Sequence, residues 1–127
     1  MKTEGYAVRR YEGPVKRYCQ FLEIENNPEL IRLYRECHGE DKHWKEIRDG
    51  IRAVGILEME MYITGRYVVM IVDTAPDFDW DSAMARLAQM PRQAEWETFM
   101  SRFQGCSPEA SANQKWTMME RMFRLYD

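Results

Sequence analysis

The feature that most restricts the fold of this chain is a hairpin pattern near its middle. Apolar and polar side chains alternate over residues 57–63, as expected of a strand with one buried face. The apolar set is Leu57, Met59, Met61 and Ile63, and the polar set is Glu58, Glu60 and Tyr62. Thr64-Gly65 is a hairpin turn signal, and residues 66–73 predict the returning strand. The chain therefore carries an antiparallel strand pair at its centre.

Helices and further strands are predicted on both sides of this hairpin. Residues 15–24 alternate and predict a first strand. Asn27-Pro28-Glu29 predicts a helix start, because an N-cap residue precedes a proline and an acid. That helix reaches His38, and Gly39 interrupts it. The remaining predicted elements are a helix over 43–53 stopped by Gly55, helical pieces over 80–89 and 91–103 with Pro91 starting the second, a polar loop over 105–114, and a last strand over 116–126.

The order of these elements is strand, helix, two strands, helix, strand, which is typical of the ferredoxin-like βαββαβ unit of α+β proteins. We expect a charged N-terminal extension over 1–13 and one domain over 14–127. Helices on one face of a four-stranded sheet leave the other face open. Since that face would carry apolar and aromatic side chains, we expect a second copy to cover it and form a dimeric α+β barrel.

Composition excludes several classes of protein. The formal net charge of -3 argues against a nucleic-acid binder, which would show a basic footprint. No stretch approaches the roughly 18 apolar residues of a membrane span, and residues 1–13 lack the apolar centre of a secretory signal. The three cysteines are odd in number and widely spaced, which favours a reducing compartment. We therefore expect a cytoplasmic protein with no membrane partner.

Few side chains are candidates for chemistry. The chain has two histidines and lacks nucleotide-binding and zinc-protease motifs, so we expect no cofactor and no metal. Leu30, Tyr34 and His38 are spaced four apart and form one row on a helix face. An imidazole at the end of that row suits acid–base work near neutral pH, but spacing alone favours a structural role, since a histidine near a helix C-terminus stabilises the helix dipole. His43 is interpreted as a surface or helix-start residue.

Two further features have both a structural and a functional interpretation. Glu58 and Glu60 lie two apart on one strand face, so they could act as paired carboxylates, although a solvated strand edge is the favoured interpretation. Trp96 could stack on the C–H face of a sugar, but a tryptophan in a helix is more often a core anchor. Spacing alone does not decide between these alternatives.

The ordered set of motifs resembles the L-rhamnose mutarotases over about residues 17–125. The matching segments are Tyr34-x-x-x-His38, Trp44-Lys45-Glu46-Ile47, Gly55 eleven residues after that tryptophan, the hairpin 59–62 to 69–72, Gln93-Ala94-Glu95-Trp96, and Met119-Glu120-Arg121-Met122-Phe123. The resemblance implies a homodimer of ferredoxin-like subunits that interconverts the α and β anomers of L-rhamnose or a related 6-deoxy sugar such as L-fucose. It implies no cofactor, and it implies His38 as the proton donor.

The same resemblance implies four sugar-contacting positions: Tyr34, Trp96, Glu95 and Met59. At three places the chain departs from the family pattern. Glu95-Trp96 stands where a Trp-Trp pair is usual, Met59 stands where a tyrosine is usual, and residues 39–43 contain two extra residues. These departures concern the sugar contacts rather than the proton donor, so they bear on which sugar is preferred.

A different class of function is also compatible with a dimeric α+β barrel. Such barrels include non-catalytic ligand-binding modules and monooxygenases that need no cofactor. A binding module would hold a sugar without accelerating anomer exchange. A monooxygenase would consume oxygen and an aromatic substrate.

Overall fold

The computed structural model describes residues 4–105 and 115–126 of the chain. Its elements are β1 (Lys16–Glu23), α1 (Pro28–Cys37), α2 (Lys45–Ala53), β2 (Ile56–Thr64), β3 (Tyr67–Thr74), α3 (Trp80–Leu87), α4 (Gln93–Gln104) and β4 (Thr117–Met118). The predicted polar loop falls largely on residues 106–114, which lie outside the described residues.

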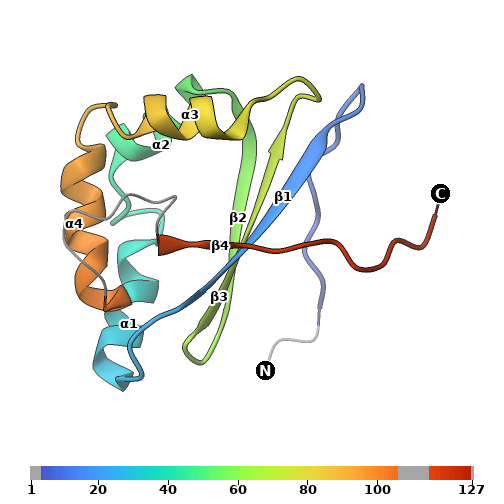
Figure 1. Ribbon diagram of the computed structural model, residues 1–127. Helices are drawn as coiled ribbons and strands as arrows, with labels where there is room; N and C mark the ends of the chain where they lie inside the picture. The colour runs from blue at the N-terminus through green and yellow to red at the C-terminus, as the bar shows by residue number, and fades with distance from the viewer. Residues whose placement is uncertain (1–3, 106–114, 127) are drawn as a thin grey trace.

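The strands form one sheet in the order β2-β3-β1-β4, with every neighbouring pair antiparallel. All four helices lie on the same side of this sheet (Figure 1). This arrangement confirms the predicted ferredoxin-like α+β unit. The start of α1 also agrees with the sequence, because the side chain of Asn27 accepts hydrogen bonds from the amides of Glu29 and Leu30.

The core lies between the helices and the inner face of the sheet. It has two clusters of buried side chains. One joins β1, α1 and α4 through residues such as Leu22, Tyr34, Trp96 and Phe103. The other joins β2, β3 and α3 through residues such as Ile56, Val72 and Leu87. Burial of these side chains is the main driving force that holds α1 and α4 over the sheet.

The alternation in β2 begins differently from the prediction. The pairing with β3 shifts between Ile56 and Glu58, so Leu57 is the extra residue of a β-bulge. Leu57 is 40% exposed, while Ile56 takes the buried position. The predicted alternation holds from Met59 to Ile63, where the side chains of Met59, Met61 and Ile63 pack against the core.

The predicted last strand over 116–126 is wrong in its extent. Only Thr117 and Met118 pair with β1, and the amide of Met119 donates one more bond to the carbonyl of Cys19. Residues 119–126 continue as an exposed arm that runs away from the body of the domain (Figure 1). The alternating sequence favours an extended chain, but a strand also needs a paired neighbour, and residues 119–126 leave the edge of β1 after the Met119 bond to Cys19.

Helix α4 begins two residues later than predicted. Pro91 lies in the turn before the helix, and Arg92 precedes it with φ 63°, in the left-handed region. The side chain of Arg92 pairs with Glu46 and Glu95, which compensates for this unfavourable backbone conformation. The turn therefore ties the start of α4 to α2.

The N-terminal segment crosses the sheet on the side opposite the helices (Figure 1). The Tyr6 ring meets the Tyr62 ring edge-on at 5.8 Å, and the Tyr11 hydroxyl donates to Asp73 at 3.0 Å. Asp73 also pairs with Arg17 of β1 at 2.7 Å. This arginine and Tyr11 together lower the pKa of the Asp73 carboxyl. Residues 4–13 are therefore docked on part of the open face.

Candidate active site

His38 lies at the C-terminal end of α1, where it caps the helix. Its Nδ1 atom lies 2.7 Å from the carbonyl oxygen of Tyr34, one turn earlier. Because a carbonyl only accepts hydrogen bonds, Nδ1 carries the proton in this contact and Nε2 carries the lone pair of the neutral ring. The helix end thus fixes both the tautomer and the orientation of the imidazole.

The surroundings of His38 are largely apolar. Burial lowers the pKa of this imidazole, and the Tyr34 carbonyl opposes the change by stabilising the protonated ring. The Tyr34 ring lies 4.5 Å from the His38 ring, and the Trp96 ring meets it edge-on at 5.5 Å. These surroundings therefore favour the neutral form of the His38 ring.

Tyr34 is buried, with 3% of its surface exposed. Burial raises the pKa of its hydroxyl, and a hydrogen bond from the Gln104 side chain opposes the rise. The resemblance implies a sugar contact for this residue, and the structure places it in the cavity wall beside His38. That contact stays a prediction.

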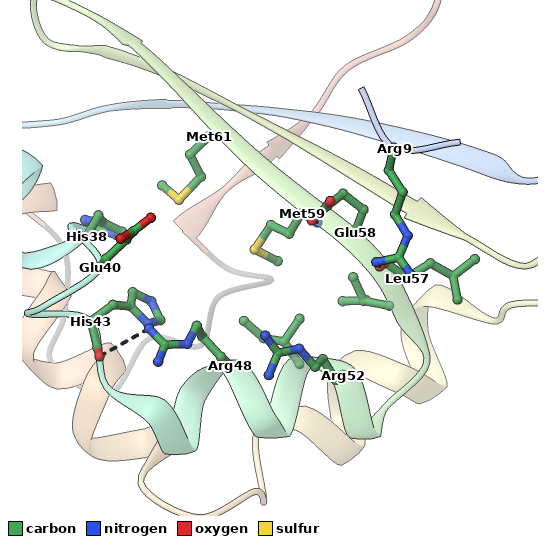
Figure 2. Close-up of a pocket in the computed structure, with 12 residues that line it drawn as sticks. Arg9, His38, Glu40, His43, Arg48, Arg52, Leu57, Glu58, Met59 and Met61 are labelled. Carbon is green, nitrogen blue, oxygen red and sulfur yellow. Dashed lines mark hydrogen bonds between the residues drawn. The ribbon is translucent and has the colours of Figure 1, made fainter. Parts of the chain in front are cut away.

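A cavity of about 610 Å³ opens between α2 and the inner face of β2 (Figure 2). His38, His43, Met59 and Met61 line both this mouth and a narrower inner end of about 70 Å³. Arginines and glutamates surround the mouth, namely Arg9, Arg48, Arg52, Glu40 and Glu58. The inner end adds Gln93, Trp96 and Glu97 of α4 and the methionines Met70 and Met100. The cavity thus combines polar groups with apolar walls, as a sugar site requires.

Trp96 forms the aromatic part of the inner wall. It is 6% exposed and contacts both histidine rings and the ring of Trp44, at 5.1 Å. The Arg92 guanidinium lies 4.0 Å from the Trp44 ring centre and covers it from outside. Trp96 is therefore both a core residue and a cavity residue. Its interpretation as a core anchor is compatible with its interpretation as a residue that contacts a ligand.

Glu95 and Met59, the other expected sugar contacts, are placed differently. Met59 lines the cavity. The Glu95 side chain is 60% exposed and pairs with Arg92 at 2.9 Å, which lowers the pKa of its carboxyl. The structure thus directs Glu95 toward Arg92, and its contact with a sugar stays a prediction.

His43 was expected at the surface or at a helix start, but it faces the cavity. Helix α2 begins only at Lys45, and residues 39–43 form a turn in which the Gly39 carbonyl accepts from the amides of Lys42 and His43. This turn brings the His43 ring to 5.8 Å from the His38 ring and 4.8 Å from the Trp96 ring. The sequence signal for this inward position was the pair of extra residues in the turn, because the insertion lies beside the predicted site.

Two polar side-chain atoms of the described residues are buried without a hydrogen-bond partner, His43 Nδ1 and Gln93 Oε1. Both residues line the inner end of the cavity. Buried polar atoms without a partner are rare in native proteins because each costs about 1–3 kcal/mol. Hydrogen-bonding atoms without a protein partner are therefore gathered beside His38, at the inner end of the cavity.

Glu58 and Glu60 do not form a carboxylate pair. The Glu58 carboxylate accepts from the amide of Met59 at the cavity mouth, and the Glu60 carboxylate accepts from the Tyr62 hydroxyl. Across residues 4–105 and 115–126, no three His, Cys, Asp or Glu side chains are arranged to hold a metal ion. Among the helices described, none has the length and apolar character needed to cross a bilayer.

Comparison with known proteins bears on the family of this chain. The family model described as L-rhamnose mutarotase matches residues 17–125. The chain belongs to the L-rhamnose mutarotase family. It is therefore an isomerase of the sugar mutarotase type, acting in the interconversion of sugar anomers.

Individual relatives extend over most of the chain. An L-fucose mutarotase of Xanthomonas campestris is 32% identical over 111 residues, which are 87% of this chain and 89% of that protein. A UPF0734 protein of Dictyostelium discoideum is 28% identical over 114 residues, 87% and 90% of the two chains. The crystal structure of an L-rhamnose mutarotase from Formosa agariphila aligns with a TM-score of 0.64 at 16% identity, covering 87% of this chain and 99% of that one. This last similarity shows a common fold.

Proposed function

We propose that the protein interconverts the α and β anomers of an L-6-deoxy sugar, with L-fucose or L-rhamnose as substrate and His38 as the proton-transfer group. The observation that carries this proposal is the His38 imidazole, which lines a cavity with Nδ1 held by the Tyr34 carbonyl. Nε2 is then the nitrogen left for exchange of a proton with a ligand. The relative named as an L-fucose mutarotase supports L-fucose as the first sugar to test.

Mutarotation needs acid–base chemistry at two neighbouring oxygens. The pyranose opens when the anomeric hydroxyl loses its proton and the ring oxygen gains one, and it closes on the other face of the aldehyde. Positioned acid–base groups typically contribute about 10²–10⁴-fold to such a rate. In this proposal Trp96 and Met59 form apolar walls, while Tyr34 and Gln93 hold sugar hydroxyls. Glu95 is the remaining expected sugar contact, and in the free protein its carboxylate is paired with Arg92.

Saturation-transfer NMR on the anomeric protons of L-fucose and L-rhamnose tests the proposal. We expect the protein to raise the exchange rate in proportion to its concentration, and His38→Gln to abolish most of that increase. Glu36→Gln, an exposed change on the same helix, serves as the matched control and should leave the rate unchanged. Binding of the sugar without faster exchange would favour a ligand-binding module instead.

We also propose that the protein is a homodimer in which the exposed arm docks on a second copy of this chain. The arm carries exposed apolar side chains, with Met122 at 98%, Phe123 at 72% and Leu125 at 74%. An extended apolar segment beside a short edge strand is suited to pairing with another sheet. Analytical ultracentrifugation should give a dimer for the full chain and a monomer after removal of residues 119–127. Phe123→Glu is a milder change to the same arm and should also weaken the dimer. A monomeric full chain would contradict the proposal.

We infer a cytoplasmic location. Cys19 and Cys37 are both free thiols, and burial raises the pKa of the Cys37 thiol to about 11, which keeps it unreactive. Free thiols are typical of reducing compartments. Fractionation of cells that produce the protein, with a cytoplasmic marker enzyme as control, tests this inference.

A further inference from the structure

The two histidines of the chain lie in one cavity, on either side of the turn over residues 39–43. Their ring centres are 5.8 Å apart. Figure 2 shows both imidazoles in the same wall of the mouth. The Trp96 ring contacts both, so a single apolar surface holds the two rings in place. In this geometry both imidazoles are placed to contact the same bound molecule.

The chemistry of the site requires such a pair. The ring oxygen and the anomeric hydroxyl of a pyranose are bonded to the same carbon, so the groups that exchange protons with them must lie near each other. A hydrogen bond from a ring nitrogen to an oxygen spans about 2.7–3.2 Å. Two imidazoles 5.8 Å apart can therefore each reach one of two neighbouring oxygens.

We propose that His43 is the second proton-transfer group of this site and works as an acid–base pair with His38. As the bond between C1 and the ring oxygen breaks, one imidazole takes the proton of the anomeric hydroxyl, and the O–H electrons form the carbonyl double bond. The other imidazole gives a proton to the ring oxygen, which keeps the electrons of the broken bond. Closure on the other face returns both protons, so the pair ends as it began. This inference rests on the proposed function.

The electrostatics of the pair fit this exchange. Burial lowers the pKa of His43 to about 4, and the neighbouring imidazole of His38 and the Arg48 guanidinium add to the effect. The Trp44 backbone opposes it weakly, although Nδ1 of His43 has no partner within hydrogen-bonding geometry. Because charge on His38 disfavours charge on His43, a proton taken up by the pair rests on one ring at a time. One partner can then donate while the other accepts.

Titratable and charged groups face His43 from every side of the cavity. They are Tyr34 of α1 and His38 at its end, Glu40 in the turn, Arg48 and Arg52 of α2, Glu58 of β2, Arg9 of the N-terminal segment and Glu97 of α4. Glu97 is paired with Lys115 at 2.9 Å, and Arg48 donates to the carbonyl of His43 itself (Figure 2). The two imidazoles therefore share the cavity with both carboxylates and guanidinium groups.

The test compares five proteins by saturation-transfer NMR with L-fucose: wild type, His38→Gln, His43→Gln, His43→Ala and the control Lys45→Gln. Lys45 lies two residues from His43, at the exposed start of α2. We expect His43→Gln to lower kcat by about 10²-fold with KM within threefold, and Lys45→Gln to change neither. Imidazole added to His43→Ala should restore part of the rate. A kcat within threefold of wild type, or a change in KM alone, would overturn the inference.

A second measurement uses the unmodified protein and does not depend on how the variants fold. With two histidines in the chain, the ring protons give two resolved sets of NMR signals. We expect both sets to shift when L-fucose saturates the site. If only the His38 signals move, His43 is not a proton-transfer group. Absence of exchange in wild type would instead refute the proposed function, whereas exchange lost in His38→Gln and kept in His43→Gln would refute this inference alone.

Discussion

The Nδ1 atom of His38 and the carbonyl oxygen of Tyr34 lie 2.7 Å apart, across the last turn of α1. The carbonyls of the last turn of a helix have no partner within it, and here the imidazole supplies one. The same contact stabilises the helix end and orients the ring. Both interpretations of His38 drawn from the sequence are therefore compatible with one geometry.

Replacement of His38 by glutamine should separate these two roles. Glutamine can still donate to the Tyr34 carbonyl, but it cannot exchange a proton. We expect anomer exchange of L-fucose to fall by about 10²–10⁴-fold with little change in the free energy of unfolding. Saturation-transfer NMR and urea denaturation measure the two quantities. A large loss of stability with unchanged exchange would make His38 a structural residue.

Tyr34→Phe should change substrate binding and stability together. It removes a buried hydroxyl that bonds to Gln104 and leaves the backbone carbonyl that orients His38. We expect a loss of about 1 kcal/mol in the free energy of unfolding and a larger increase in KM than decrease in kcat. Chemical denaturation and substrate titration check these values. A fall in kcat as large as that of His38→Gln would contradict the separation of roles.

The stability of the protein should decrease as the pH falls below the ordinary range of histidine. In the folded state the pKa of His43 is about 4, whereas an unfolded histidine titrates near 6.5. Between these values the unfolded chain binds more protons, so the free energy of unfolding falls as pH drops from about 6.5 toward 4. Urea denaturation at several pH values should show a shallower decrease for His43→Gln. Equal slopes for the two proteins would contradict the burial of this imidazole.

The ion pair between Glu97 and Lys115 should be costly to break on one side only. The Lys115 side chain has no exposed surface, and its ammonium group contacts both the carboxylate and the backbone carbonyl of Glu97. Lys115→Ala leaves a buried carboxylate, so we expect a loss of about 3–5 kcal/mol in the free energy of unfolding. The double variant Glu97→Gln, Lys115→Met should recover most of it. Thermal denaturation compares the stability of the single and the double variant. Equal losses of stability in the two would exclude a buried charge as the cause.

Much of the fold was predictable because its signals are local. The Asn27-Pro28-Glu29 start of α1 and the alternation around Thr64-Gly65 depend on residues a few positions apart. The extent of the last strand was not predictable, since an extended segment pairs only where the folded chain keeps it beside β1, and the arm leaves that edge after Met119. His38 could be identified as a candidate, but its catalytic interpretation needed the resemblance to a family.

The position of His43 shows why part of the site could not be predicted. Its sequence neighbours are polar on one side and Trp44 on the other, which fits a surface residue. The backbone amides of Lys42 and His43 donate hydrogen bonds to the Gly39 carbonyl. These bonds reverse the chain and turn the His43 ring inward. Helices and strands have a periodic pattern of apolar residues in the sequence, but a turn of this kind has none. The pairing of the two imidazoles is therefore seen only in the folded chain.

The methionines of the cavity wall have a consequence for substrate choice. Met59, Met61, Met70 and Met100 line the inner end, and each thioether side chain has several rotatable bonds and adapts to irregular shapes. Such a wall adapts its shape to sugars that differ in the orientation of one hydroxyl group, so it does not exclude them sterically. Discrimination between epimers then depends on the few fixed polar atoms, above all the amide oxygen of Gln93. We therefore expect L-fucose and L-rhamnose to undergo anomer exchange at rates of the same order, which saturation-transfer NMR on the two sugars measures.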